Sequence, residues 1–221
     1  MLGADAMLKA ILFDLDNCLA AADEPGKDLL VPLFHAIHAT NHGHFSEEEL
    51  RFIEFDCWRH PLDHVFEKYG FPEAMRSAAW NANREIRVTS PMKGYGDLHL
   101  LEEFAVPLFL VTAGFQGLQQ SKIEALGFAR HFKETHIDAV DVPGRIGKKG
   151  LFQDILSRHG ISADEALVVG DNPDSEIAAG LALGIPTVQT LRPGVPRTEA
   201  ATHHVSGLAE LLALTGGLKV L

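Results

Sequence analysis

The sequence predicts an α/β fold, in which a Rossmann-like parallel sheet is flanked by helices and interrupted by a small all-helical domain. Short apolar segments that end at polar turns predict buried strands, because strands of a parallel sheet are covered on both faces. From about residue 92 onward these segments alternate with helical patterns, which is typical of strand–helix–strand units. Residues 20–91, in contrast, contain only helical patterns.

Six segments carry the strand pattern. The segment "LKAILFD" at 8–14 is short and apolar and ends at a polar turn, and "EALVVGD" at 165–171 is equally apolar. The segment "THIDAV" at 135–140 is only partly apolar. The remaining strands are expected at 107–112, at 185–190 and at the start of 203–214, where a short edge strand leads into a final helix.

Helical patterns fill the intervals between these strands. Residues 117–127 and 150–160 place apolar side chains at helical spacing and end at glycines, which favour the left-handed conformation of a helix C-terminus. Residues 174–184 begin with good capping residues and also end at a glycine. Ser162 and Glu165 have the spacing of a capping box.

Residues 20–91 form the predicted insertion. Several helical patterns follow one another in it, and Ser46 with Glu49 marks the N-terminus of one helix. The flanking stretches at 23–27 and 89–96 carry proline and glycine, as linkers between domains often do. We therefore expect two domains, a core made of 1–19 and 92–221 and a helical domain at 20–91.

The composition is that of a globular protein. Of the 221 residues, 46% are apolar and 22% are charged, and the formal net charge of −11 argues against nucleic acid as a partner. No apolar run reaches the roughly eighteen residues that span a bilayer. The start "MLGADAMLKA" lacks the pattern of a signal peptide. With two cysteines, Cys18 and Cys57, we expect a cytoplasmic protein without a disulfide framework.

Two carboxylates, Asp14 and Asp16, directly follow the first predicted strand in the stretch "ILFDLDNCL". The only basic residue within ten positions on either side is Lys9, so burial of these carboxylates requires a positive charge from elsewhere. Ligands of an open parallel sheet bind beyond the carboxyl ends of its strands. The residues expected there are Asp14, Asp16, Thr112, Lys148 or Lys149, and Asp171 with Asp174 and Glu176 beyond it. Such a set of carboxylates suits a hard divalent cation such as Mg²⁺.

The same residues resemble the motifs of the haloacid dehalogenase-like hydrolase superfamily. "FDLDNCL" is similar to the family's first motif, Asp-x-Asp-x-Thr/Val, with Cys18 in the threonine position. Thr112 resembles the second motif, a serine or threonine that ends the next strand. The third motif is a lysine just before a helix, matched by Lys148 or Lys149, and its place in the loop favours Lys148.

The fourth motif and the insertion extend the resemblance over the whole chain. Gly170 and Asp171 with Glu176 are similar to the fourth motif, a Gly-Asp followed by an acid four or five residues later. Residues 20–91 lie between the first and second motifs, where members of the family carry a helical cap that closes over the site. One Asp-x-Asp is a common pattern, whereas the ordered set with this topology is specific.

The resemblance implies a Mg²⁺-dependent phosphatase that hydrolyses small phosphomonoesters through an aspartyl-phosphate. Asp14 would be the nucleophile and Asp16 the general acid and base. Asp14, Asp171 and the main-chain carbonyl of Asp16 would bind Mg²⁺, while Thr112 and Lys148 would hold phosphate oxygens. Relatives that cleave carbon–halogen bonds lack an acid at the position of Asp16, which favours phosphoryl transfer over dehalogenation.

Neighbouring residues are assigned by their positions beside these motifs. We expect substrate contacts from Asn17, Ala113, Gly114, Lys149 and, in the insertion, Arg59. Beside the metal we expect Glu176, Asp174 and Asn172, with Glu176 orienting the lysine or a metal-bound water. Arg59 and His60 would face the substrate from the insertion, although an ordinary amphipathic helix end is the commoner explanation of their stretch. Cys18 is interpreted as an inert substitute for threonine.

Other functions stay open at this level. A phosphomutase of the same family would return the phosphoryl group to its substrate and give an isomerised phosphate. A receiver-like signalling domain shares a phosphorylatable aspartate, a threonine, a lysine and Mg²⁺, and would give a stable phosphoprotein. The expected partner is a small phosphorylated metabolite such as a nucleoside monophosphate, a sugar phosphate or phosphoglycolate, bound by a monomer or homodimer without nucleic acid or membrane.

Overall fold

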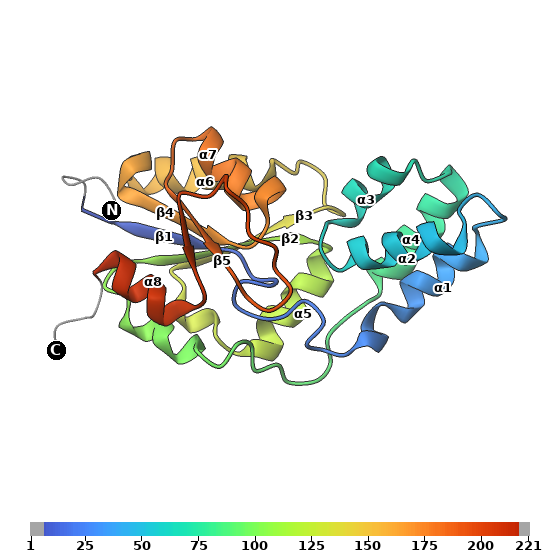
Figure 1. Cartoon of the computed structure of the whole chain (residues 1–221), viewed down its shortest axis with the longest axis horizontal. Helices are drawn as coiled ribbons and strands as arrows, with labels where there is room; N and C mark the ends of the chain where they lie inside the picture. Colours follow the sequence, from blue (N-terminus) through green and yellow to red (C-terminus); the bar gives the residue numbers. More distant parts are fainter. Residues whose placement is uncertain (1–6, 217–221) are drawn as a thin grey trace.

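A computed structural model describes residues 7–216 as a six-stranded sheet with helices on both faces and a separate group of helices beside it (Figure 1). The strand order is β3-β2-β1-β4-β5-β6, and every neighbouring pair is parallel. The strands are β1 Ala10–Phe13, β2 Leu108–Gly114, β3 Glu134–Ala139, β4 Ala166–Gly170, β5 Thr187–Thr190 and β6 His203–Val205. The predicted α/β class is confirmed.

The central strand β1 explains why the first strand reads as a continuous apolar run. It pairs with β2 on one side and β4 on the other, and all its residues are buried. Ile11 and Phe13 belong to the apolar cluster on one face of the sheet, whereas Ala10 and Leu12 belong to the cluster on the other. Alternate residues of a strand point to opposite faces, so a strand covered on both faces needs apolar residues at every position.

Four helices cover the two faces of the sheet. They are α5 Gln116–Leu126, α6 Gly147–His159, α7 Ala178–Ala182 and α8 Leu208–Thr215. Ile123 of α5 and Leu211 of α8 pack into one apolar cluster, while Phe152 of α6 and Ala179 of α7 pack into the other. Short 3₁₀ turns lie at Lys27–Leu30, Leu98–Glu103, Ala129–His131 and Ala163–Glu165.

The helix predicted over 174–184 is wrong in its first turn. Residues Pro173–Ile177 form a wide, irregular turn of π type, and the regular part of α7 begins only at Ala178. The backbone of Ser175 is outside the helical region, with φ −117° and ψ −105°. This kink turns the side chain of Glu176 inward, where it is 1% exposed. The residues that predict a helix start therefore form an irregular turn, and this turn points the carboxylate of Glu176 into the protein.

The helices between β1 and β2 form a unit with its own apolar interior. They are α1 Val31–Ala39, α2 Glu47–Cys57, α3 Leu62–Tyr69 and α4 Glu73–Arg84. We call residues 31–84 the helical unit. Ser46 and Glu49 form the predicted capping box at the start of α2. Ile37 and Ile53 are fully buried inside the unit, and Phe115 of the core joins the same apolar cluster.

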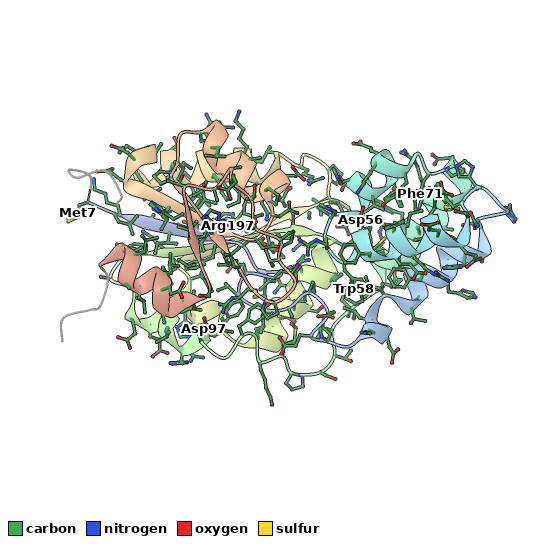
Figure 2. The ribbon with its side chains drawn as sticks, in the orientation of Figure 1. Met7, Asp56, Trp58, Phe71, Asp97 and Arg197 are labelled. Carbon is green, nitrogen blue, oxygen red and sulfur yellow. The ribbon has the colours of Figure 1, made fainter. Side chains whose placement is uncertain are left out.

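The helical unit lies beside the end of the sheet at which its strands finish (Figure 1). Trp58 lies on the side of the unit nearest the sheet, whereas Phe71 lies farther away (Figure 2). The arrangement brings the segment that follows α2 to the carboxyl edge of the strands. Among the described residues, none of the helices combines the length and hydrophobicity that crossing a membrane requires.

Candidate active site

The loop after β1 presents Asp14 and Asp16 at the carboxyl edge of the sheet. The backbone N–H of Asp14 donates to the Val169 carbonyl oxygen at 2.9 Å, which fixes the end of β1 against β4. Asn17 has a φ of 55°, a left-handed conformation that asparagine tolerates better than most residues. Its side-chain oxygen accepts a hydrogen bond from the Ala22 N–H at 3.2 Å, so Asn17 holds the loop and also lines the cleft.

Lys148 supplies a positive charge to Asp14, the first of the two aspartates. Its Nζ lies 2.6 Å from Asp14 Oδ1 and 2.7 Å from Glu176 Oε2, and all three side chains are buried. Lys148 stands in the first turn of α6, and its neighbour Lys149 is exposed and does not line the cleft. The geometry therefore favours Lys148 as the lysine of the third motif, and the expected contact of Lys149 with the substrate is not brought about.

Burial shifts the pKa values of this cluster strongly. Desolvation raises the pKa of Asp14 to about 7, against the opposing attraction of Lys148. Desolvation, together with the charges of Glu176 and Asp14, raises the pKa of Asp171 to about 8. Desolvation opposes the charged form of Lys148, but the carboxylates of Asp14 and Glu176 outweigh it and raise the pKa of the ammonium. The site thus contains more buried carboxylates than nearby cations.

The surplus of carboxylates fits a divalent cation. Oxygens of Asp14, Asp171 and Glu176 all lie within 4.8 Å of one another. Both carboxylate oxygens of Glu176 already accept hydrogen bonds. One accepts from Lys148, and the other accepts from the backbone N–H of Asn172 at 2.6 Å. Among the described residues, the carboxylate of Asp171 has only a distant ion pair with Arg59, at 3.6 Å. Asp14 and Asp171 are therefore the carboxylates best placed for a metal, with Glu176 orienting Lys148.

Glycine is required where Glu176 folds back under β4. A Cβ at Gly170 would lie 2.3 Å from Cγ of Glu176, closer than nonbonded carbon atoms approach. The Gly-Asp pair of the fourth motif therefore has a steric reason in this chain. Glycine leaves room for the inward acid, and Asp171 follows at the end of the strand.

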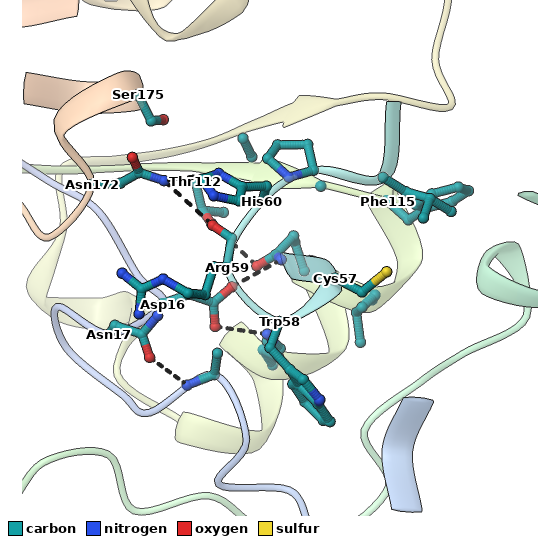
Figure 3. A pocket seen from close by; sticks show the side chains of 18 of the residues that line it. Asp16, Asn17, Cys57, Trp58, Arg59, His60, Thr112, Phe115, Asn172 and Ser175 are labelled. Atoms are coloured by element: carbon teal, nitrogen blue, oxygen red, sulfur yellow. Dashed lines mark hydrogen bonds and ion pairs between the residues drawn. The ribbon is translucent and has the colours of Figure 1, made fainter. Parts of the chain in front are cut away.

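Asp16 is held by two buried residues that the sequence analysis does not single out. Lys122 Nζ lies 2.6 Å from Asp16 Oδ1, and Gln119 Nε2 donates to Asp16 Oδ2 at 3.1 Å. Gln119 Oε1 accepts in turn from the Thr112 hydroxyl at 3.1 Å. A chain of polar contacts thus joins Thr112 to Asp16 (Figure 3).

The signal for these two residues is their spacing in α5. Gln119 and Lys122 are three positions apart, and residues with this spacing share one face of a helix. The helix directly follows the strand that ends in Thr112, so its first turns lie near the strand ends. The prediction of a helix over 117–127 considers only its apolar side chains and therefore misses these two residues.

The segment that follows α2 brings the helical unit into the site. The Asn172 amide donates to the Arg59 carbonyl oxygen at 3.3 Å and lies 3.4 Å from His60 Nδ1. Arg59, His60 and Trp58 line the same cleft as Asp16 and Thr112 (Figure 3). The stretch is the end of a helix, as the commoner explanation expects, and it also lines the cleft. Arg59 and Asn172 reach the cleft as expected.

The remaining expected residues divide into two groups. Ala113 and Gly114 line the cleft, and a Cβ at Gly114 would lie 2.8 Å from Nε2 of Gln119. Asp174 is exposed and does not line the cleft, so the structure does not bring it to the metal side. Its N–H donates to the Asn172 side chain at 2.9 Å, which stabilises the turn.

Cys18 stands where the first motif has threonine, and its side chain carries a thiol in place of the hydroxyl. Its side chain is fully buried, its Sγ lies 3.7 Å from the Val169 carbonyl oxygen, and burial raises the pKa of the thiol well above its usual range. A neutral, enclosed thiol is a poor nucleophile. Cys18 and Cys57 are both free, in keeping with a chain that does not depend on a disulfide framework.

The haloacid dehalogenase-like hydrolase family matches residues 8–184, which is most of the chain. The chain belongs to this family. The family match spans the first motif, the helical unit and the fourth motif in one stretch.

Two curated relatives of this family member are phosphatases by name. A phosphoserine phosphatase from Thermus thermophilus is 31% identical over 132 residues, which are 58% of this chain and 52% of the relative. The chain thus spans about half the length of that relative. A glyceraldehyde 3-phosphate phosphatase from Methanopyrus kandleri is 28% identical over 205 residues, which are 84% of this chain and 85% of the relative.

Solved structures share the fold of this hydrolase. A protein described as a predicted phosphatase from Clostridium acetobutylicum has a TM-score of 0.72 at 19% identity, covering 95% of this chain and 98% of its own. A HAD-hydrolase from Bacillus subtilis that was solved bound to magnesium has a TM-score of 0.58 at 18% identity, covering 95% and 99%. Identities this low establish the architecture of the sheet and the helical unit, and nothing finer.

Proposed function

We propose that the chain is a Mg²⁺-dependent hydrolase of small phosphomonoesters that forms an aspartyl-phosphate on Asp14. The observation that carries this proposal is the buried cluster in which Lys148 lies 2.6 Å from Asp14 and 2.7 Å from Glu176, next to Asp171. The two curated relatives, both named phosphatases, support phosphomonoesters as the substrate class.

In the first half of the proposed reaction, a carboxylate oxygen of Asp14 attacks phosphorus. The new O–P bond forms as the bond from phosphorus to the leaving-group oxygen breaks. The ammonium of Lys148 and the hydroxyl of Thr112 hold the phosphoryl oxygens, whose negative charge they stabilise. Mg²⁺ bound by Asp14 and Asp171, with the Asp16 carbonyl as a further ligand, would neutralise charge on the phosphoryl group.

Asp16 moves the protons of both halves. It gives a proton to the leaving-group oxygen, and then takes a proton from the water that attacks the aspartyl-phosphate. The second attack breaks the bond between phosphorus and the Asp14 oxygen and releases inorganic phosphate. Lys122 and Gln119 hold the two carboxylate oxygens of Asp16, which fixes its direction toward the cleft.

We further propose that residues 20–91 act as the cap and that 1–19 with 92–221 form the catalytic core. The contacts of Asn172 with Arg59 and His60 support closure, because they join the core to the helical unit directly over the site. Such a cap admits a small metabolite and excludes a macromolecule. We also propose a monomer or homodimer in the cytoplasm. The two free cysteines agree with a reducing compartment.

The test is phosphate release from p-nitrophenyl phosphate and a panel of natural phosphate esters, with and without Mg²⁺. We expect release by the wild type with Mg²⁺, and a loss of at least about 10³-fold in Asp14→Asn, which lacks the nucleophile. Asp174→Asn is the matched control, since Asp174 is exposed and outside the cleft.

Each contrary outcome points to a different function. Wild-type protein that releases no phosphate from any ester contradicts the hydrolase. An isomerised ester in place of free phosphate would identify a mutase. A stable phosphoprotein that does not turn over would support the receiver-like alternative.

A further inference from the structure

Arg59 is the cation of the cleft with the weakest ion pair. Its side chain is 17% exposed and lines the cleft, and its ion pair with Asp171 spans 3.6 Å, which is beyond hydrogen-bond distance. Lys122 and Lys148, in contrast, each lie 2.6 Å from a carboxylate oxygen. The proposed metal would also draw the carboxylate of Asp171 to itself. Arg59 is therefore the cleft cation that is free to bind a ligand.

The position of Arg59 is fixed by contacts with both parts of the chain. Its carbonyl oxygen accepts a hydrogen bond at 3.3 Å from the side-chain amide of Asn172, which follows the end of β4. Its guanidinium carbon lies 5.9 Å from the ring centre of Phe55, four residues earlier, within the range of a cation–π contact. Arg59 stands in the cleft together with Asp16 and Asn172 (Figure 3). The helical unit thus holds a guanidinium beside the strand ends.

The charges of the cleft balance a phosphoryl dianion only when Arg59 is counted. The cleft is lined by four carboxylates and three cations, and burial lowers the pKa of His60, which favours its neutral form. In the proposed first step Asp16 carries a proton, so Mg²⁺ and the three cations exceed the remaining carboxylates by two charges. A phosphate ester carries nearly two negative charges at pH 7. Without Arg59, the occupied cleft would keep an unbalanced negative charge, which is unfavourable.

The place of Arg59 favours the transferred phosphoryl group over the leaving group as its ligand. Its neighbour Asp171 is one of the two carboxylates assigned to the metal, and oxygens of Asp171 and Asp14 lie within 4.8 Å of each other. The phosphoryl group lies beside the nucleophile and the metal during transfer. A guanidinium at this place can donate two parallel hydrogen bonds to phosphoryl oxygens.

We propose that Arg59 is a catalytic residue that the helical unit supplies. Its guanidinium leaves Asp171 to the metal, binds nonbridging oxygens of the phosphoryl group and stabilises their charge during transfer. This role rests on the proposed phosphatase function. Thr112 and Lys148 bind the phosphoryl group from the core, whereas Arg59 binds it from the helical unit. The reaction therefore requires the helical unit to be closed over the site.

The first experiment measures kcat/KM of Arg59→Met for p-nitrophenyl phosphate and glycerol 3-phosphate, whose leaving groups carry no ionised substituent. We expect a loss of about 100-fold on both, because a donor to the phosphoryl group serves every ester. Arg51→Met is the matched control, since it makes the same change at an exposed position of α2. A loss below about threefold, or one confined to a single ester, would overturn the inference. Wild-type protein that releases no phosphate from any ester would overturn the proposed function itself.

The second experiment measures binding without turnover. Isothermal titration calorimetry gives the Kd of Mg²⁺ and, at saturating Mg²⁺, the Kd of inorganic phosphate. We expect Arg59→Met to bind phosphate about tenfold more weakly, and to bind Mg²⁺ at least as tightly as the wild type, since a cation beside Asp171 repels the metal. Unchanged phosphate binding would overturn the inference. If Mg²⁺ binding were weaker at the same time, the role of Arg59 would be to position Asp171.

A third variant separates the charge of Arg59 from its shape and guards against loss of folding. Arg59→Lys keeps the positive charge but lacks the planar guanidinium that donates two parallel hydrogen bonds. We expect its kcat/KM to fall about tenfold, between the wild type and Arg59→Met, with thermal unfolding like that of the wild type. A folded lysine variant as impaired as Arg59→Met would show that the charge does not act on the phosphoryl group, and would overturn the inference.

Discussion

Two clusters of charged residues in this hydrolase use the same side-chain chemistry in opposite environments. At the carboxyl edge of the sheet, Asp14, Asp171 and Glu176 are buried around Lys148. At the start of β3, Glu134 accepts contacts from Arg158 at 2.7 Å, His159 at 2.6 Å and His136 at 2.8 Å, all partly exposed.

The pKa values of the two clusters move in opposite directions. Hydrogen bonds from Arg158 and the two histidines lower the pKa of Glu134. Burial raises the pKa of Asp14 and Asp171 to about 7 and about 8. A carboxylate surrounded by donors in water is stable as an anion, whereas buried carboxylates that outnumber their cations destabilise the fold. Such strain is typical of a site built to receive a cationic ligand.

The largest expected effect is that of removing Lys148, the central cation of the buried cluster. We expect Lys148→Met to abolish turnover and to lower the free energy of unfolding by about 3–5 kcal/mol, because Asp14 and Glu176 lose their buried partner. Chemical denaturation and phosphate release measure the two effects. Lys149→Met is the matched control next to it in sequence, and it is exposed. A Lys148 variant as stable as this control would contradict the described cluster.

The next effect concerns Mg²⁺ and pH. The folded pKa values of Asp14 and Asp171, about 7 and about 8, lie above the ordinary value of 3.8. Without metal, the folded state therefore binds more protons than the unfolded state in this window, and stability falls as pH rises from about 4 to about 8. Mg²⁺ favours the ionised carboxylates, so its stabilisation is expected to grow between pH 6 and pH 8.

Thermal unfolding with and without Mg²⁺ at pH 6, 7 and 8 measures this dependence. We expect Mg²⁺ to raise the midpoint temperature of the wild type most at pH 8, and to raise that of Asp14→Asn less. When neither protein has metal, we expect the Asp14→Asn variant to have the higher midpoint temperature. An increase that is independent of pH, or equal in both proteins, would show that Mg²⁺ acts elsewhere.

The sequence predicts the buried cluster well because each strand fixes the position of the residues directly after it. In a parallel sheet the carboxyl ends of neighbouring strands lie side by side, so residues directly after β1 and β4 meet whatever their separation in sequence. This rule of strand ends predicts Asp14 and Asp171 from the sequence. Lys148 is also accessible, since it stands at the start of the helix that follows the third strand, although the choice between it and Lys149 needs the helix rotation. Adjacent helical residues point about 100° apart, and only one faces the cluster.

The residues that the sequence does not predict all depend on how helices are turned. Gln119, Lys122 and Asn83 look like solvent-facing polar residues, because helical periodicity distinguishes the faces of a helix but not what each face meets. Lys122 of α5 and Asn83 of the helical unit are both buried and line the same cleft. The kink at Ser175, which turns Glu176 inward, is likewise invisible in a segment whose residues favour helix starts.

The smallest expected effect concerns the partly exposed cluster around Glu134. Glu134→Gln removes an anion whose folded pKa is below its ordinary value of 4.5, so its contribution to stability is present above that pH and is lost as pH falls below it. We expect a loss of about 1 kcal/mol or less at pH 7, weaker at high salt and smaller at pH 4, because partly exposed ion pairs are screened by water and ions. Denaturation curves at both pH values measure it, with the exposed Glu67→Gln as control. A loss that is larger at pH 4 than at pH 7 would reverse the sign argued for this cluster and remove the contrast with Asp14 and Asp171.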